Sequence, residues 1–329
     1  MPDAPSALPA APAAPVVCEL APLAVLAVSG ADAADFLHGQ LSSDVRGLPA
    51  GRCQYTSFNS PKGRVLANFV LWRHGDGFRA LLPADLAEPV RKRLAMYVLR
   101  SKVVLADASA DTVRFGIGGP GAATAVAAAC GEAPDAFGVK ALPGGATMLG
   151  LPGPRFVVVA PAAAAGSMRD ALRRHAAPAP FDVWQWLTIR AGVPVVTTAT
   201  QDQFVAQAAN WDLLGGVNFQ KGCYTGQEII ARMQYLGRLK ERTHLFHVDG
   251  APAAAGDRLY SAAFGDQACG TVVNAAPAPA GGTDLLAVVQ LAATAAGDVR
   301  LGAPDGPPLV ALPLPYAIPA PVEPRGRVG

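Results

Sequence analysis

Long apolar runs, paired cysteines and surplus charge are all missing from this 329-residue chain. The most apolar late stretch, residues 285–296, falls short of the roughly 20 residues that a membrane-spanning helix needs. The five cysteines, at positions 18, 53, 130, 223 and 269, are widely spaced and form no C-x-x-C pair, so neither a disulfide framework nor a zinc knot is indicated. The net charge of +2 is spread out and gives no footprint for strong nucleic-acid binding.

Phosphate-binding and hydrolase motifs are absent as well. No G-x-x-x-x-G-K-[ST] or G-x-S-x-G sequence occurs, which disfavours an NTPase and a serine hydrolase of the α/β type. Residues 116–121 match G-x-G-x-x-G, but no acidic strand end follows, so a plain strand–turn–helix is favoured. Residues 1–17 are rich in Pro and Ala without Lys or Arg, so we expect a disordered extension, not a signal peptide, and a cytoplasmic protein with no membrane partner.

The chain does contain two rounds of mixed strands and helices, followed by short strands alone. Strands are predicted at 24–28, 54–58, 65–72, 79–82, 103–106, 112–117 and 156–159, and helices after 30–32 and at 86–99, 120–129, 162–174 and 181–191. Beyond residue 243 the helical signal vanishes, and strands are predicted at 244–248, 258–260, 268–274, 285–291 and 309–312. This pattern predicts an α+β fold followed by a small β-barrel or sandwich, with the boundary near Leu239.

The most informative stretch is Lys-Gly-Cys-Tyr-Thr-Gly-Gln-Glu at 221–228. Thr225 and Glu228 have the spacing of a capping box, and apolar residues then repeat at helical spacing as far as a glycine at 237. Cys223 therefore precedes a helix N-terminus, and both the helix dipole and Lys221 favour its thiolate form. Such a cysteine is a candidate nucleophile or ligand. The alternative is a small buried residue in a tight turn.

Two further segments have the composition of a ligand site. Asn59 to Arg64 form a polar, glycine-containing loop between apolar strands, and such loops often carry binding residues. Gln207, Asn210 and Trp211 lie just upstream of the cysteine and could give an aromatic wall and amide groups to a flat heteroaromatic ligand. A simple hairpin connection, and packing or capping roles, are the alternatives.

With Arg232, Gly237 and Lys240, residues 221–228 resemble the signature of the YgfZ family of folate-binding proteins, which are relatives of the glycine-cleavage T-protein. The likeness runs from about Leu23 to Tyr316 through segments 30–44, 60–65, 191–194, 207–210 and 270–273. It implies a ring of two α+β lobes and a β-barrel around a central folate pocket. The implied divisions are an extension at 1–17, a GcvT-like folate-binding domain at 18–238, a barrel at 239–318 and a loose tail at 319–329.

The resemblance also implies a cofactor, partners and site residues. The cofactor is tetrahydrofolate or a one-carbon derivative, and the partners are iron–sulfur enzymes, among them the enzyme that methylthiolates tRNA, or cluster-assembly proteins. Cys223 and Lys221 would be the reactive residues, within a motif completed by Gly222, Tyr224, Thr225, Gly226, Gln227 and Glu228. The folate cleft would be bordered by Tyr55, Asn59, Arg64, Gln207, Asn210 and Trp211, with no metal ligand among them.

Departures from the aminomethyltransferase pattern bear on catalysis. Leu66 and Ala67 stand where those enzymes have an acidic pair, and Arg190 replaces another acid. A carboxylate near the pterin would orient the ring and stabilise developing charge, so we expect folate binding without aminomethyl transfer. Asp44 and Glu228 remain as possible substitutes. A folate-dependent one-carbon transferase with an unknown substrate, and a non-catalytic interaction scaffold, stay open as alternatives.

Overall fold

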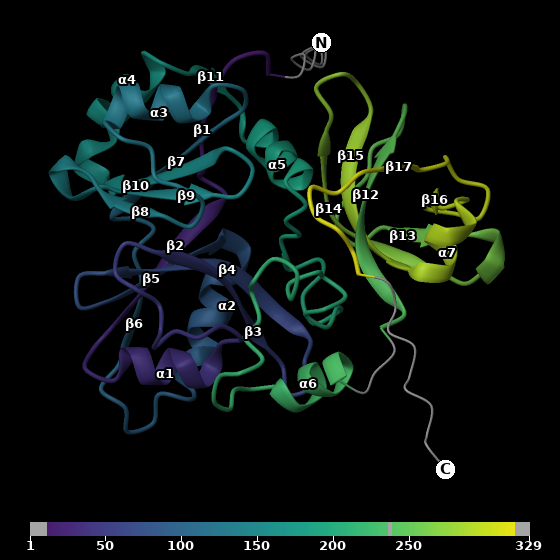
Figure 1. The fold of residues 1–329 in the computed structure, drawn as a ribbon, viewed down its shortest axis with the longest axis horizontal. Coiled ribbons are helices and arrows are strands. Elements are labelled where there is room, and N and C mark those ends of the chain that lie inside the picture. The colour runs from purple at the N-terminus through teal and green to yellow at the C-terminus, as the bar shows by residue number, and fades with distance from the viewer. Residues whose placement is uncertain (1–11, 236–238, 320–329) are drawn as a thin grey trace, which may run out of the picture.

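The computed structural model describes residues 12–235 and 239–319, and in this part the chain forms three β-sheets. The two N-terminal sheets lie one above the other on the left of Figure 1, and the C-terminal sheet stands beside both on the right. Helices cover the N-terminal sheets, so the α+β prediction with two lobes and a third, all-β lobe is confirmed. Within the described residues, no helix is long and apolar enough to cross a membrane.

The first lobe is a five-stranded antiparallel sheet in the order β3-β4-β5-β2-β6. Its strands are β2 (Leu23–Ser29), β3 (Cys53–Asn59), β4 (Val65–His74), β5 (Gly77–Pro83) and β6 (Val104–Asp107), and its helices are α1 (Ala33–Gln40) and α2 (Ala84–Ala95). The helix predicted at 86–99 was too long at its end. Leu99 has a left-handed φ of +45° and is 88% exposed, so the apolar pattern continues past the point where the backbone leaves the helix.

The second lobe is a six-stranded sheet in the order β11-β1-β7-β10-β9-β8. Its strands are β1 (Val16–Glu19), β7 (Thr112–Gly118), β8 (Val139–Ala141), β9 (Thr147–Leu151), β10 (Arg155–Pro161) and β11 (Ala177–Ala179), and its helices are α3 (Ala122–Cys130), α4 (Ala165–Arg173) and α5 (Phe181–Arg190). β1 begins inside the stretch expected to be an extension. It pairs with β7 and β11, which are far away in sequence, and a local pattern does not reveal such pairing.

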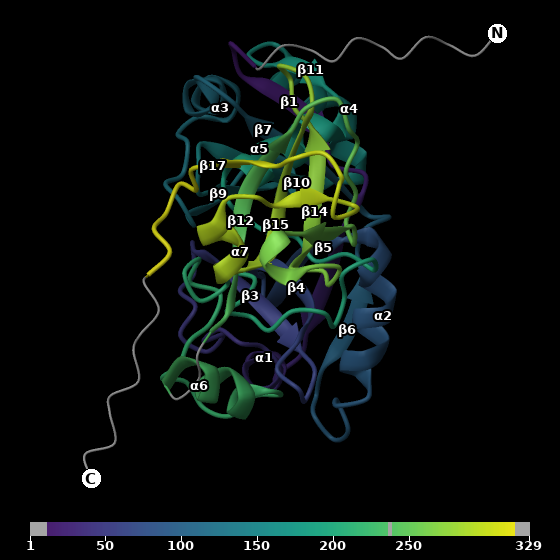
Figure 2. The same ribbon diagram turned by 90° about the vertical axis from the view of Figure 1, so that its right-hand side faces the viewer.

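The third lobe is a curled six-stranded antiparallel sheet in the order β16-β13-β14-β15-β12-β17, which lies in front of the other two in Figure 2. Its strands are β12 (Glu241–Val248), β13 (Arg258–Tyr260), β14 (Gly270–Pro277), β15 (Thr283–Gln290), β16 (Arg300–Leu301) and β17 (Val310–Leu312). It also contains a short helix, α7 (Leu291–Ala296), in a region where only strands were predicted. One turn and a half of small apolar residues carries too little periodicity to distinguish a helix from a strand.

The segment between α5 and α6 (Gln227–Tyr235) has no strands or helices and fills the space between the three sheets (Figure 1). A buried ion pair fastens this segment to β12: the Arg242 guanidinium lies 2.6 and 3.0 Å from the two Asp212 carboxylate oxygens, and it also donates to the Gln207 carbonyl. Asn210 adds a second connection, since its amide donates to the Thr243 carbonyl. The third lobe is therefore held by polar contacts at its first strand.

A second junction joins α5 to the third lobe and makes stability depend on pH. His247 Nδ1 lies 2.7 Å from Asp284, whose other oxygen accepts from the Trp186 indole. Burial alone would lower the pKa of His247, but hydrogen bonds to Asp284 and Asp249 outweigh it and raise the pKa. A raised folded-state pKa stabilises the fold fully below the unfolded pKa of about 6.5, and this contribution is lost as the pH rises through the folded value.

We therefore expect His247→Gln to lower the free energy of unfolding most at about pH 5–6 and progressively less toward pH 8–9. Urea titrations of both proteins across this range measure the difference. Asp135→Asn, a change in an exposed ion pair with Arg52, is the control and should give a small difference with no such trend. A His247→Gln deficit that grows as the pH rises would contradict the assignment of the raised pKa.

Candidate functional site

A cavity with largely apolar walls lies where the first and second lobes meet the α5–α6 segment. Its empty space is about 470 Å³ when the solvent at its open side is counted, and about 70 Å³ when only the room for water-sized molecules is counted. Aromatic side chains from four parts of the chain line it: Tyr55 on β3, Phe69 on β4, Trp184 on α5 and Trp211 in the α5–α6 segment. The remaining lining residues are Leu23, Asn68, Val70, Leu81, Leu82, Pro83, Leu151, Arg155, Thr188, Val193 and Val195.

Tyr55 and Trp211, both predicted as ligand residues, form one wall of this cavity. Their ring centroids lie 5.2 Å apart at an angle of 38°, and Phe137 packs edge-on against Tyr55 from the other side. Burial raises the pKa of Tyr55, although the nearby Arg155 opposes this, so the phenol stays protonated. In the described part of the chain the Trp211 indole N–H has no hydrogen-bond partner, and its nitrogen is buried against Gly216. The wall thus offers flat apolar surfaces, which suit a heteroaromatic ring.

Arg155 is the residue of the cavity that sequence reasoning missed. It is 2% exposed, and its guanidinium donates to the Thr188 hydroxyl, the Pro152 carbonyl and the Tyr55 hydroxyl. No carboxylate belongs to the residues that line the cavity, and no ion pair of Arg155 occurs in the described part of the chain. A buried cation without a counter-ion is costly, and its neutral partners leave it able to pair with an anionic ligand. In the sequence, the feature that could have indicated this residue is an arginine at the first position of an otherwise apolar strand, β10 (Arg155–Pro161).

On β4, the polar residue that lines the cavity is Asn68, which is neither of the two positions considered from the sequence. Leu66 and Ala67 are buried but do not line the cavity, whereas Asn68 does. Its amide donates to the Pro194 carbonyl at 2.6 Å and accepts from the Val196 N–H at 2.9 Å, so it is already satisfied. Arg190 does not line the cavity either, because it points to the third lobe and lies 3.6 Å from Asp284. No acid therefore stands at any of these positions.

The other four residues predicted to contact a folate lie outside the cavity. Arg64 is exposed and donates to the carbonyls of Asp202 and Gln203, and Asn59 is buried with its carbonyl bound to the Ser57 hydroxyl. Gln207 donates to the Ile230 carbonyl at 2.6 Å, which ties α6 to the segment before it. Asn210 is bound to Thr243 of β12. Asn59, Gln207 and Asn210 have amide side chains, and an amide that connects elements looks like one that binds a ligand in a sequence. The folate contacts of these three residues and of Arg64 stay predictions.

The cysteine motif forms a turn that leads into α6, but the predicted capping box is wrong. α6 begins at Gln227, and the side-chain Oε1 of Gln227 accepts from the Tyr224 N–H at 3.2 Å, so the reciprocal bond comes one residue earlier than expected. Gly226 has φ +81°, and a Cβ there would lie 2.4 Å from the Ser60 carbonyl and 2.9 Å from the Gly63 Cα. This turn therefore packs backbone against backbone on the β3–β4 loop. The predicted helix end at Leu236 and Gly237 lies outside the described residues.

Lys221 is bound to α1. Its ammonium donates to the carbonyls of His38 and Leu41 and lies 4.7 Å from the centroid of the Tyr224 ring. Burial is the main reason that the pKa of Lys221 is lowered to about 8. Among the described residues, no hydrogen bond joins this ammonium to Cys223. Lys221 instead caps carbonyl groups at the C-terminal end of α1.

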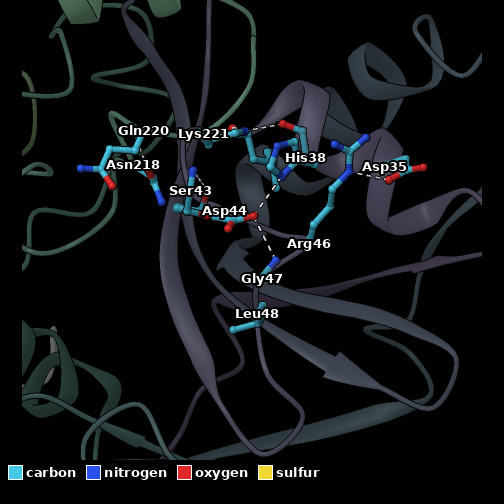
Figure 3. Close-up of polar contacts among 12 residues, drawn as sticks. Asp35, His38, Ser43, Asp44, Arg46, Gly47, Leu48, Asn218, Gln220 and Lys221 are labelled. Atoms are coloured by element: carbon cyan, nitrogen blue, oxygen red, sulfur yellow. Dashed lines mark hydrogen bonds and ion pairs between the residues drawn. The ribbon is translucent and has the colours of Figure 1, made fainter.

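A hollow with mixed polar and apolar walls lies near Lys221 and is lined by Ser43, Asp44, Gln54, Gly215, Val217, Asn218, Phe219, Gln220 and Tyr235. Figure 3 shows polar contacts of Asp44 and of Lys221 in this region. His38 Nδ1 lies 3.1 Å from Asp44, which also accepts from the Gly47 N–H. Burial, followed by the charges of Lys221 and Arg46, lowers the pKa of His38, so the ring is neutral at pH 7. In the described part of the chain, no group of three His, Cys, Asp or Glu side chains is placed to hold a metal ion.

Exposure separates Cys223 from the other four thiols. Cys223 is exposed, Cys130 is half-buried and the other three are buried. Burial raises the pKa of Cys18 to about 11 and of Cys53 to about 12, and it raises that of Cys130 as well. A protonated, covered thiol reacts slowly because the thiolate is the nucleophile.

We therefore expect iodoacetamide at neutral pH to alkylate Cys223 at least about tenfold faster than any other cysteine of the folded protein. Mass spectrometry of digests after timed labelling measures each rate, and Cys223→Ser should remove the fast phase. Unfolding in urea, which exposes all five thiols, should bring the rates together. A fast phase that persists in Cys223→Ser would show that another thiol is the accessible one.

Comparison with known proteins agrees with this architecture. The GCVT N-terminal domain family matches residues 11–141. The crystal structure of glycine cleavage system aminomethyltransferase T from Bartonella henselae superimposes with a TM-score of 0.75 at 16% identity, over 91% of this chain and 85% of that one. The fold is thus of the aminomethyltransferase type, as the resemblance implied.

Sequence comparison is more specific. The tRNA-modifying protein YgfZ of Serratia proteamaculans (strain 568) is 32% identical over 298 residues, which are 87% of this chain and 88% of that protein. Proteins of the same name from Cronobacter sakazakii and Shigella boydii serotype 4 are 34% and 35% identical over 211 residues, which are 64% of this chain and 64% of each of those. The chain belongs to the YgfZ family.

Proposed function

We propose that this protein is a folate-binding accessory protein that supports iron–sulfur enzymes and iron–sulfur-dependent tRNA modification, with Cys223 as its reactive group. The observation that carries the proposal is the cavity, where Tyr55, Trp184 and Trp211 surround a buried guanidinium and no lining residue is acidic. The relatives are tRNA-modifying proteins YgfZ by name, which supports the tRNA part. This function would place the protein in the cytoplasm, with iron–sulfur enzymes or cluster-assembly proteins as partners.

Tetrahydrofolate fits the side chains that are present. A pterin offers a flat ring to the aromatic wall, and folates carry carboxylates that a guanidinium can bind. The cation proposed for that carboxylate is Arg155, in place of Arg64, which is exposed at the far end of the β3–β4 hairpin. When bound, the folate would supply a one-carbon carrier. The protein's own part is to stack, orient and enclose it.

Calorimetry with tetrahydrofolate tests the binding. We expect saturable binding to the wild type and strong weakening in Tyr55→Ala, which removes half of the aromatic wall. Arg64→Ala is the matched control and should bind as the wild type does, because Arg64 lies outside the cavity. Absence of binding at millimolar folate would remove the folate proposal.

A deletion strain tests the cellular role. The strain is scored for iron–sulfur enzyme activities and tRNA methylthiolation, and then complemented with the wild type, Cys223→Ala or Cys130→Ala. The proposal requires that the wild type and Cys130→Ala restore both readouts and that Cys223→Ala does not. Full rescue by Cys223→Ala would make the cysteine dispensable and favour a non-catalytic scaffold.

Aminomethyl transfer is the second candidate function, because the fold is that of an aminomethyltransferase. The composition of the cavity disfavours aminomethyl transfer, because no carboxylate lines the cavity. Asp44 contacts His38 and Gly47 on another surface. An assay with tetrahydrofolate and an aminomethylated lipoyl carrier protein should give no methylene-tetrahydrofolate at ordinary enzyme rates. Turnover at such rates would make the transferase the leading function.

We also propose the domain division implied by the family, with a folate-binding domain at 18–238 and a C-terminal domain at 239–318. One apolar cluster spans both N-terminal lobes and the α5–α6 segment, whereas the C-terminal sheet has a cluster of its own, which supports this division. Limited proteolysis should cut near residue 239 before it cuts within the lobes.

A further inference from the structure

The surface around the end of α2 has an unusual composition. Residues 89–106 contain five cations and no acid: Arg91, Lys92, Arg93, Arg100 and Lys102. Arg91 and Lys92 pair with Glu88. For the other three, no ion pair occurs in residues 12–235 and 239–319. Two further carboxylates lie nearby: Asp32 lines the same surface hollow as Leu99 and Arg100 and accepts from the Lys102 N–H, and Asp107 accepts from the Ser109 N–H. Against Glu88, Asp32 and Asp107, the five cations leave a surplus of two positive charges.

Apolar side chains stand exposed among these cations. Leu99 is 88% exposed, Met96 64% and Val104 62%, and Tyr97 is also exposed. We call these four residues the α2–β6 patch. Leu99 adopts its left-handed backbone conformation without burying its side chain. Several adjacent exposed apolar residues with a charged rim are typical of a surface that binds another protein.

The patch borders an open sheet edge. β6 is the last strand of the first sheet, and in the described residues it pairs with β2 alone. α2 packs beside β6, as both views of the ribbon show (Figures 1 and 2), so the loop between them brings the cations to this edge. An edge strand offers unpaired backbone N–H and C=O groups, to which an extended peptide can add as a further strand.

We propose that this edge docks an extended acidic segment of a partner protein. The segment adds to β6 as an antiparallel or parallel strand, packs apolar side chains on Leu99 and Val104, and places carboxylates near Arg93, Arg100 and Lys102. The exposed leucine, methionine and valine favour a protein over a nucleic acid, because phosphates would use the cations and leave the apolar side chains in water. The proposal is independent of the folate site, which lies on other residues of the same lobe.

The probe is a fluorescein-labelled synthetic octapeptide of alternating Val/Ile and Glu/Asp, titrated against the full chain and followed by fluorescence anisotropy. We expect saturable binding that weakens at least about tenfold in Leu99→Asp and in the double variant Arg100→Glu/Lys102→Glu. A peptide with lysine in place of each acid should bind the double variant better than it binds the wild type. Val310→Asp is the control, since Val310 is 55% exposed on another edge strand, and should bind as the wild type does.

Hydrogen exchange adds a readout of strand addition, because amides of Val104–Asp107 should be slowed by the acidic peptide. The proposal is overturned if no saturable binding occurs, if both variants bind like the wild type, or if the β6 amides are unaffected. It is also overturned if a bulk tRNA mixture displaces the peptide and binds Leu99→Asp unchanged, since RNA would then be the occupant. A concentration-dependent dimer that Leu99→Asp abolishes would identify the occupant as a second copy of the chain.

Discussion

Arg155→Met is expected to weaken tetrahydrofolate binding by about 10- to 150-fold while leaving the fold intact. A hydrogen bond between charged groups contributes about 1.5–3 kcal/mol, and this corresponds to that loss in affinity. The ligand-free protein should lose little stability. Removing a buried cation that has no counter-ion relieves its desolvation cost, and this offsets the loss of its bonds to Thr188, Pro152 and Tyr55. Calorimetry gives the affinity and urea titration the free energy of unfolding.

The control for Arg155→Met is Arg52→Met, which removes an arginine from an exposed pair with Asp135. It should leave folate affinity unchanged and cost at most about 1 kcal/mol of stability. Unchanged affinity in Arg155→Met would mean that the guanidinium does not meet the ligand. A loss of more than about 3 kcal/mol in the ligand-free variant would mean that Arg155 is mainly a structural residue of the α5–β10 junction.

Asp212→Ala should have the largest effect on stability of any single change considered, a loss of about 3–5 kcal/mol. Its carboxylate makes two hydrogen bonds to Arg242, and both side chains are buried. Alanine would leave the guanidinium buried without its counter-ion. Because this pair joins the α5–α6 segment to β12, the third lobe should also become easier to detach. Urea unfolding measures the first effect and protease sensitivity near residue 239 the second.

Two further variants decide whether the ion pair itself is responsible. Asp135→Ala breaks an exposed pair and should cost at most about 1 kcal/mol. The double variant Asp212→Leu/Arg242→Met replaces both charges by apolar groups and should recover much of the loss. An Asp212→Ala protein within about 1 kcal/mol of the wild type would show that solvent reaches Arg242 and compensates its charge.

Much of the fold could be predicted because most elements carry their own periodicity. The β3–β4 hairpin is separated by a loop of turn-forming residues, and α5 and β12 have clear apolar patterns. The sequence did not predict β1, β8, β9, β11, β16 or α7, and the reasons differ for β1 and α7. β1 is stabilised by strands about 100 and 160 residues away, and α7 is too short for a helical repeat. The end of α2 was misjudged because the exposed Met96 and Leu99 continue an apolar pattern that packing does not use.

The site could be predicted only in part. Aromatic residues such as Tyr55 and Trp211 seek burial, so their approach to a central cavity followed from residue type and the family likeness. Polar residues gave no such guide. In the structure, Gln207 binds α6 and Asn210 binds β12. Arg155 begins a strand whose other residues are apolar and therefore indicate only a buried strand. Which buried polar group faces a cavity depends on how β3, β10 and α5 pack together in three dimensions. A local sequence pattern does not indicate how elements far apart in the chain pack.

The backbone contact of Gly226 with Ser60 and Gly63 has a mechanical consequence. Tyr55 lines the cavity on β3, and four residues further along the same strand, about 13 Å at 3.3 Å per residue, the loop begins that holds the turn after Cys223. One end of the β3–β4 hairpin thus lines the cavity, and its loop packs against the turn that follows Cys223. We expect a ligand that shifts β3 and β4 to displace the cysteine turn too, because a Cβ at Gly226 would overlap the Ser60 and Gly63 backbone and little space separates the two segments. The β3–β4 hairpin therefore connects the wall of the cavity to the turn that follows the thiol.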